Sequence, residues 1–194
     1  MDITDRKSIV LIDSYLKKKL SPLRYRHSVS TAETASMMCE KFGVDKNKGY
    51  AAGLIHDIAR EFKADALLKY SAGYGGKISG FEIKSPVILH GRAGAVIARD
   101  KFGIKDSDVL ESIAYHTTGR AGMGTLSKII FIADHIEPAR SHITCNYMKS
   151  LEGMALDSIL KTVLISVLDY TGKKYKNTSR DSIKLLEELD SEKK

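Results

Sequence analysis

The 194-residue chain has no tryptophan, three prolines and two cysteines, and aromatic residues make up only 7% of it. Cys39 and Cys145 stand far apart, so they cannot form the C-x-x-C pair of a redox or zinc site, and free thiols are expected. So few aromatic residues argue against a base-stacking surface for nucleic acid. Apolar runs fall far short of the roughly 20 residues that a membrane helix needs, and no signal peptide opens the chain. A cytoplasmic protein without a membrane partner is therefore expected.

The charge balance favours anionic partners without requiring nucleic acid. Lys and Arg number 31 against 24 Asp and Glu, a net charge of +7. Much of this excess lies in short lysine runs, such as Lys17–Lys19, Lys173–Lys174 and Lys193–Lys194, which are typical of solvated helix faces. Hydrophobic residues at 43% and charged residues at 28% are ordinary globular values. Nucleotides, nucleic acid or acidic protein surfaces would all fit this balance, and solvated helix faces explain the lysine runs better than nucleic acid does.

Helical spacing of apolar residues dominates the chain, and no segment alternates over the length of a strand. An all-α fold follows. Helices are predicted over about 9–20, 22–42, 45–59, 86–102, 106–115 and 125–136, with an apolar stripe over 156–168. Glycine-rich segments at 71–80 and 119–124 interrupt the pattern, and neither matches a P-loop. No linker divides the sequence, so a single domain over 1–194 is predicted.

Two carboxylates stand in otherwise apolar segments. His56 and Asp57 lie within the segment 51–59, and Asp134 lies within 126–136. A buried carboxylate requires a metal, a cation or strong hydrogen-bond donors. A core His–Asp pair, a capped helix end or an arginine partner would also satisfy these residues, so each position alone leaves the choice open.

The histidines strengthen the case for a metal when they are taken as a set. His27, His90 and His116 each stand on a predicted helix or helix end, as do His56–Asp57 and Asp134. Such a set suits a site inside a helical bundle, and imidazole with carboxylate suits iron, manganese or zinc better than calcium. His135 and His142 are not expected to be ligands.

The order His…His-Asp…His…His…Asp resembles the HD-domain metal-dependent phosphohydrolases. The closer resemblance is to the YqeK family, described as symmetrical bis(5′-nucleosyl)-tetraphosphatases. It rests on Arg24-Tyr25-Arg26-His27-Ser28, on residues 52–60, on Leu89-His90-Gly91, on Tyr115-His116-Thr117-Thr118-Gly119-Arg120, and on residues 128–140. The chain departs from the family at Arg60, His135 and Ala139, where lysine, tyrosine and glycine are usual. The resemblance implies a single HD-domain helical bundle with a metal-binding core over about 22–140 and C-terminal helices over about 147–190.

The resemblance further implies two divalent or mixed-valence transition-metal ions. The family suggests iron, and manganese, cobalt, nickel and zinc also fit the ligand types. His27, His56, Asp57 and Asp134 would hold the first ion, and His90 and His116 the second, with Asp57 bridging the two. The implied reaction is hydrolysis of diadenosine tetraphosphate to two ADP by a bridging water or hydroxide, with Asp57 and His56 as catalytic residues.

Substrate contacts are predicted from the same motifs. Planar guanidinium groups match phosphate oxygens, which points to Arg60, Arg120 and Arg140. Thr117 and Thr118 would add hydroxyl donors, and His90 is also expected on the substrate side.

Other interpretations of the sequence remain open. The site could act on another nucleotide or alarmone, activate oxygen at a di-iron pair, or serve a non-catalytic nucleotide- or RNA-sensing module. The 156–168 stripe could form bundle core or a homodimer face.

Overall fold

The computed structural model describes residues 2–140, 143–175 and 178–191, and the regular structure in this part of the chain is entirely helical. The helices are α1 (Arg6–Lys19), α2 (Pro22–Lys41), α3 (Lys46–Ile55), α4 (Ala64–Ala72), α5 (Gly80–Lys84), the 3-10 turn η1 (Pro86–Leu89), α6 (His90–Phe102), α7 (Ser107–Tyr115), α8 (Thr125–Ile136), α9 (Cys145–Ser150), α10 (Leu156–Tyr175) and α11 (Arg180–Ser191). The predicted all-α class is confirmed. Among the described residues, no helix is both long and apolar enough to cross a membrane.

Local capping explains where several helices begin. Ser21 accepts a hydrogen bond from the Arg24 backbone N–H, and Pro22 occupies the first turn of α2. Asp45 caps α3 by accepting from the Asn47 N–H. Asp106 caps α7 by accepting from the N–H groups of Asp108 and Val109. These polar side chains replace backbone partners that the first turn of a helix lacks.

The predicted helix over 45–59 was too long, because α3 ends at Ile55. His56 is the C-cap of the helix, and the chain then continues in turns with hydrogen bonds between residues three apart. The Ile58 N–H donates to the Ile55 carbonyl at 3.0 Å, and the Arg60 N–H donates to the Asp57 carbonyl at 2.9 Å. The apolar pattern ran on because the turn is as buried as the helix. The predicted helix over 86–102 likewise begins as a 3-10 turn, and α6 proper starts at His90.

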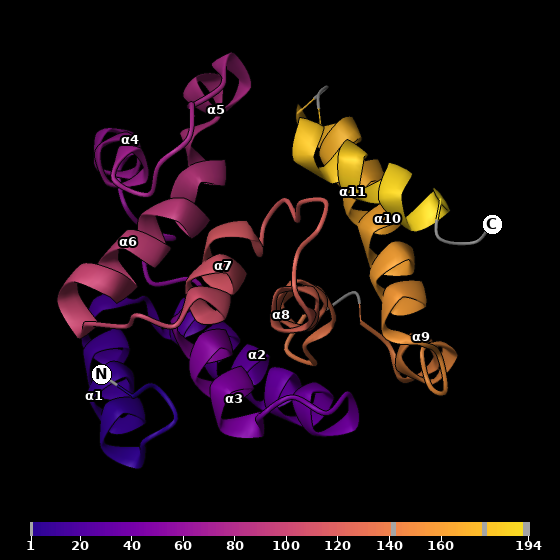
Figure 1. Ribbon diagram of the computed structural model, residues 1–194, viewed down its shortest axis with the longest axis horizontal. Coiled ribbons are helices and arrows are strands. Elements are labelled where there is room, and N and C mark those ends of the chain that lie inside the picture. Colours follow the sequence, from indigo (N-terminus) through magenta and orange to yellow (C-terminus); the bar gives the residue numbers. More distant parts are fainter. Residues whose placement is uncertain (1, 141–142, 176–177, 192–194) are drawn as a thin grey trace.

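Helix α8 occupies the centre of the fold and is seen end-on in Figure 1, with α2, α3 and α7 on one side and α9 to α11 on the other. One apolar cluster packs α1 to α4, α6 and α7 against α8, through residues such as Ile129 and Ile130. A second cluster packs the opposite face of α8, including Phe131 and Ile132, against α10 and α11. An all-round apolar helix is therefore explained by burial between two layers. The 156–168 stripe contributes to this second cluster.

Two glycines let the helices that carry the site approach closely. A Cβ on Gly53 would lie 2.8 Å from Ala32 Cα, so α3 and α2 meet backbone to backbone. A Cβ on Gly91 would lie 2.5 Å from the carbonyl oxygen of Ala114, where α6 crosses α7. These contacts bring His27, His56, His90 and His116 toward one point, since each histidine lies close to one of the crossings.

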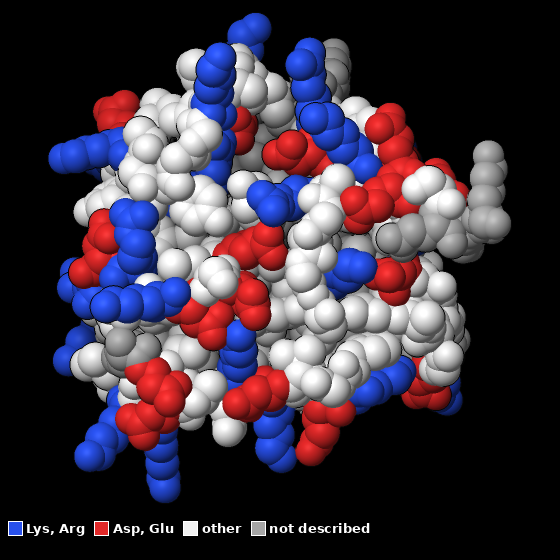
Figure 2. All heavy atoms as spheres, in the orientation of Figure 1, with Lys and Arg blue, Asp and Glu red and all other residues white. Residues whose placement is uncertain are grey.

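Basic and acidic side chains are interspersed on the face of the molecule that Figure 2 shows. Several lysines and arginines are neutralised by pairing, for example Lys48 with Asp106 at 2.8 Å and Lys128 with Asp157 at 2.6 Å. The net positive charge therefore does not form a single basic stripe on this face.

Candidate metal centre and adjoining cavity

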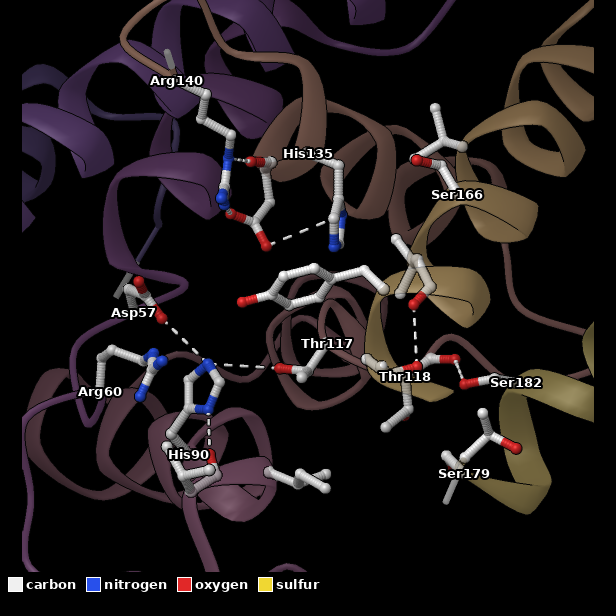
Figure 3. Close-up of a pocket in the computed structure, with 18 of the residues that line it drawn as sticks. Asp57, Arg60, His90, Thr117, Thr118, His135, Arg140, Ser166, Ser179 and Ser182 are labelled. Atoms are coloured by element: carbon white, nitrogen blue, oxygen red, sulfur yellow. Dashed lines mark hydrogen bonds and ion pairs between the residues drawn. The ribbon is translucent and has the colours of Figure 1, made fainter. Parts of the chain in front are cut away.

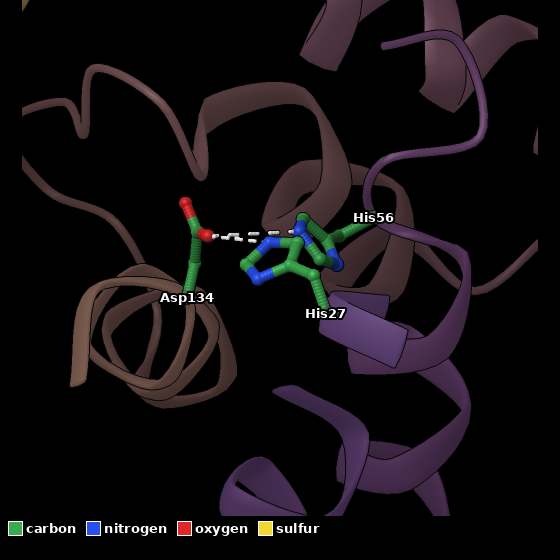
Figure 4. A group of neighbouring side chains, drawn as sticks. All are labelled: His27, His56 and Asp134. Carbon is green, nitrogen blue, oxygen red and sulfur yellow. Dashed lines mark ion pairs between the residues drawn. The ribbon is translucent and has the colours of Figure 1, made fainter. Parts of the chain in front are cut away.

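The six side chains that the sequence singled out as metal ligands meet in the interior. All six are buried: His27, His56, Asp57, His90, His116 and Asp134. The donor atoms of five of them form two overlapping groups, one with His27, His56 and Asp134 and the other with His56, Asp57 and His116. His90 belongs to neither group, but its Nε2 lies 3.0 Å from Asp57 Oδ1. Figure 4 shows the two imidazoles of the first group turned toward the Asp134 carboxylate from α8. The His27 Nε2 atom lies 3.0 Å from Asp134 Oδ1.

Asp57 lies between the two halves of this cluster. Its Oδ2 atom is 3.6 Å from Nε2 of both His27 and His56. Its Oδ1 atom is 3.0 Å from His90 Nε2 and 3.6 Å from His116 Nε2. One carboxylate therefore faces both halves with different oxygens, which is the arrangement that a bridging ligand requires.

Three histidines are oriented by their own helix ends. The Nδ1 atoms of His56, His90 and His116 lie 2.6, 2.5 and 2.8 Å from the carbonyl oxygens of Gly53, Val87 and Ile113. A carbonyl can only accept, so each Nδ1 carries the proton and donates it. Each Nε2 then presents its lone pair to the cluster. The carbonyl involved is always that of the residue three positions earlier in the chain.

His27 is oriented by a distant partner. Its Nδ1 lies 3.0 Å from Oε1 of Glu137, a residue that is only 1% exposed. The other oxygen of Glu137 accepts from the Ala139 backbone N–H at 2.6 Å. A carboxylate that accepts a hydrogen bond from a ligating imidazole fixes the ring and raises its basicity. Glu137 lies within residues 128–140, which carry part of the family resemblance, but it was not among the predicted site residues.

Electrostatics keep both cluster aspartates ionised. Burial would raise the pKa of Asp57, but the surrounding imidazoles, His56 first, hold it well below its usual value. Burial would likewise raise the pKa of Asp134, but His135, His27 and Arg140 hold it well below the usual range. Burial lowers the pKa of His56 to about 3, so this ring is neutral. Burial also acts on His27, but the carboxylates of Asp134 and Glu137 outweigh it and raise its pKa to about 9.

The donor set fits metal ions. The Nε2 atoms of His90 and His116 lie 2.9 Å apart, although both rings donate through Nδ1 to backbone carbonyls. Two lone pairs at that distance repel unless a cation or a shared proton lies beside them. The buried Nε2 of His56 has no hydrogen-bond partner among the described residues. Buried polar atoms are rarely left without partners, so these nitrogens favour coordination of a transition metal.

Two arginines contact the cluster carboxylates from outside. Arg24 Nη1 lies 2.7 Å from Asp57 Oδ2, and Arg140 Nη2 lies 2.5 Å from Asp134 Oδ1. Arg140 also donates from Nε to the Asp134 carbonyl oxygen. Arg24 was not among the predicted site residues. Its position three residues before His27, on the same face of α2, was a signal that could have identified it.

A cavity of about 760 Å³ opens from the cluster toward the C-terminal helices. Its cluster end contains Asp57, His90 and Asp134, and its far wall comes from α10 and α11. In Figure 3, Ser166, Ser179 and Ser182 lie across the cavity from Asp57 and His90. Tyr147, Val163, Val167, Tyr170 and Thr171 add apolar and hydroxyl surface to the lining. Such a volume with few charged groups at one end is typical of small-molecule sites.

Most of the predicted substrate contacts line this cavity. They are Arg60, His90, Thr117, Thr118 and Arg140. The Thr117 hydroxyl lies 3.3 Å from His90 Nε2, and the Thr118 carbonyl accepts from Ser182 Oγ at 2.6 Å. These contacts join the motif around His116 both to the cluster and to α11.

Arg120 lies elsewhere and does not line the cavity. Its Nη2 atom is 3.0 Å from Glu111 Oε1, and its guanidinium stacks over Tyr115 with a centroid distance of 4.9 Å. Its contact with phosphate stays a prediction.

His135 faces the cavity although it belongs to neither metal group. Its Nδ1 donates to the Phe131 carbonyl at 2.7 Å, which leaves Nε2 for the cavity side. His142, which was not expected to be a ligand, lies outside the described residues. The far wall of the cavity had no signal in the sequence, because serine and threonine on the polar side of α10 look like any solvated face.

Comparisons with known proteins agree with this geometry. The family model for the HD domain matches residues 24–139. A Bacillus subtilis protein named bis(5′-nucleosyl)-tetraphosphatase, symmetrical, is 31% identical over 82% of this chain and 85% of its own length. A protein of the same name from Halalkalibacterium halodurans is 30% identical over 92% of this chain and 95% of its own.

A solved structure also matches over nearly the whole chain. It is described as a "predicted HD superfamily hydrolase involved in NAD metabolism" from Clostridium acetobutylicum. The TM-score is 0.87 at 31% identity, with 94% of this chain and 97% of the other covered. A helical fold with histidines and aspartates converging in its core defines the HD-domain class. Within that class, this chain belongs to the YqeK-like family, as do the two relatives above that carry the tetraphosphatase name.

Proposed function

We propose that this protein hydrolyses a dinucleoside tetraphosphate, with diadenosine tetraphosphate as the leading substrate, at its central anhydride to release two nucleoside diphosphates. The main support for this proposal is that Asp57 faces two sets of buried imidazoles at the end of a cavity. Both curated relatives named above bear the name of this activity.

The proposed ligands are those whose donors converge. His27, His56, Asp57 and Asp134 would hold one ion, and His90 and His116 would hold the second with Asp57 shared. His56 Nε2 stands close to both donor groups. Ions bound there would neutralise charge on phosphoryl oxygens and lower the pKa of water toward neutrality. Iron is proposed first, with manganese, cobalt, nickel and zinc as alternatives that the same ligands suit.

The chain's own residues would orient the polyphosphate. Arg24, Arg60 and Arg140 border the cavity at the cluster end, where a tetraphosphate needs neutralising charge. Arg24 and Arg140 contact Asp57 and Asp134 now, so we infer that both side chains turn toward phosphate oxygens when the aspartates hold metal. Thr117, beside His90, would donate a hydroxyl hydrogen bond to the same oxygens.

We also propose that the whole chain acts as one unit. Helices α10 and α11 supply the far wall of the cavity whose other end is the histidine–aspartate cluster. Ser182 of α11 donates directly to the backbone of Thr118 beside that cluster. A homodimer is not needed to complete this site.

The test is turnover of diadenosine tetraphosphate by protein reconstituted separately with Fe²⁺, Mn²⁺ and Co²⁺, with products separated by chromatography. ADP as the nucleotide product is expected. Asp57→Asn should lower kcat at least about a hundredfold, because one change removes a charged ligand from both halves. Asp100→Asn on the exposed surface of α6 is the matched control and should leave kcat unchanged. AMP with ATP would refute central cleavage, and absence of turnover with every metal would refute the proposed substrate.

A further inference from the structure

A second cleft of about 530 Å³ lies on the other side of the two arginines that contact the cluster. It is lined by Leu23, Arg24, Arg26, His27, Glu137, Ala139 and Arg140. Arg24 and Arg140 also line the first cavity. The two hollows therefore meet at this pair of guanidinium groups, directly beside Asp57 and Asp134.

The chemistry of the second cleft suits a phosphorylated ligand with an apolar part. Three of its lining residues are arginines. Arg26 is exposed and makes no hydrogen bond or ion pair within the described part of the chain. Leu23, one helical turn before it, is 70% exposed. Residues three apart on a helix share a face, so Leu23 and Arg26 together border the cleft.

The proposed substrate needs two directions of exit from the cluster. A dinucleoside tetraphosphate carries a nucleoside on each side of the central anhydride. In-line attack of water at one central phosphorus expels the other nucleoside diphosphate as the leaving group, so each half of the substrate needs its own place beside the cluster. The first cavity extends from the cluster along α10 and α11 and would take one half. The second cleft offers the other half a separate path past Arg24 and Arg140.

We propose that the second cleft is a subsite for the other nucleoside diphosphate half of the substrate. Arg24 and Arg140 would carry its phosphates, and Leu23 and Arg26 would contact its nucleoside. This inference rests on the proposed function and adds a residue assignment to it. Apolar contact with a base face and stacking of guanidinium on it are both tolerant of base identity.

The test compares two substrates that share the bond to be broken. Adenosine 5′-tetraphosphate has one nucleoside, and water attack at its central anhydride gives ADP and pyrophosphate. Leu23→Ser should lower kcat/KM for diadenosine tetraphosphate roughly tenfold, with the loss in KM, and change the value for adenosine 5′-tetraphosphate less than about twofold. Arg26→Gln should show the same selectivity. Met37→Ser is the control, because Met37 is 73% exposed on the same helix and lines neither hollow.

Equal losses on both substrates, or no loss on either, would overturn the subsite. An independent readout is the number of ADP molecules bound per chain of metal-loaded protein by equilibrium dialysis. Two are expected for the wild type, with the weaker site impaired in Leu23→Ser, and a single site would overturn the inference. If the wild type cleaves neither substrate, the proposed function itself fails. If it cleaves both and Leu23→Ser behaves as wild type, only the second subsite fails.

Discussion

Replacement of Glu137 by glutamine tests how strongly a residue outside the metal ligands controls the cluster. The carboxylate is buried and accepts from His27 Nδ1 at 3.0 Å and from the Ala139 N–H at 2.6 Å. Glutamine offers one oxygen in place of two and turns an amide donor toward one of these donors. Loss of a charge-assisted hydrogen bond of this kind costs about 1.5–3 kcal/mol.

That free energy corresponds to a loss of about 10–100-fold in affinity for the metal proposed at His27. The assay is competition titration of metal-free protein with Co²⁺ against a chromogenic chelator, which does not depend on turnover. Saturating metal should restore most of kcat, since Glu137 positions a ligand and does not touch the substrate. Glu40→Gln, an exposed glutamate on α2, is the control. A Glu137→Gln affinity within twofold of wild type would refute the view that this carboxylate orients His27.

Two further predictions concern stability. In chelator-treated protein, the pKa of His27 is about 9 in the folded state against 6.5 in the unfolded state. Protonation of His27 therefore stabilises the fold by about 3 kcal/mol below pH 6.5, and this contribution disappears as the pH rises through 9. Urea unfolding should therefore show the gap between wild type and His27→Gln narrowing from pH 6.5 to 9, and a pH-independent gap would contradict it. Gly91→Ala should cost roughly 1–3 kcal/mol, because its Cβ would meet the Ala114 carbonyl at 2.5 Å, whereas Gly80→Ala, with open space around it, should be nearly neutral. Equal urea midpoints for these two variants would exclude the steric explanation.

The sequence predicted elements best where one local cause decides them. Helix α8 runs over the predicted 125–136, because apolar residues on every side allow no other element of that length. The start of α2 at Pro22 also agrees, since Ser21 and Pro22 form a local capping signal. The end of α3 was missed because the break at His56 depends on how the ring and Asp57 turn toward the cluster. Helices α4 and α5 were not predicted, because they are short, and α9 and α11 were predicted only within the unspecified C-terminal helices over about 147–190 that the family resemblance implies.

The site residues, like the helices, could be predicted where local sequence decides them and not where tertiary packing does. The six candidate ligands could be picked out because histidines and carboxylates are anomalous in apolar segments. The cavity wall from α10 and α11 could not, because it depends on which face of each helix turns inward. Glu137 and Arg24 act through other side chains, and that relation becomes visible only when residues far apart in the chain, such as His27 and Glu137, are seen together.

The histidines are anchored in two different ways, so their orientations should differ in how well they survive partial unfolding. His56, His90 and His116 are each restrained through a carbonyl three residues away, so their orientation forms and is lost together with one local turn. His27 is held by a residue 110 positions distant and keeps its orientation only while α2 and the segment after α8 stay assembled. Partial opening of the molecule would therefore release the orientation of His27 before that of His56, His90 and His116. The proposed metal site thus combines three imidazoles oriented by local turns with a fourth whose orientation depends on the complete fold.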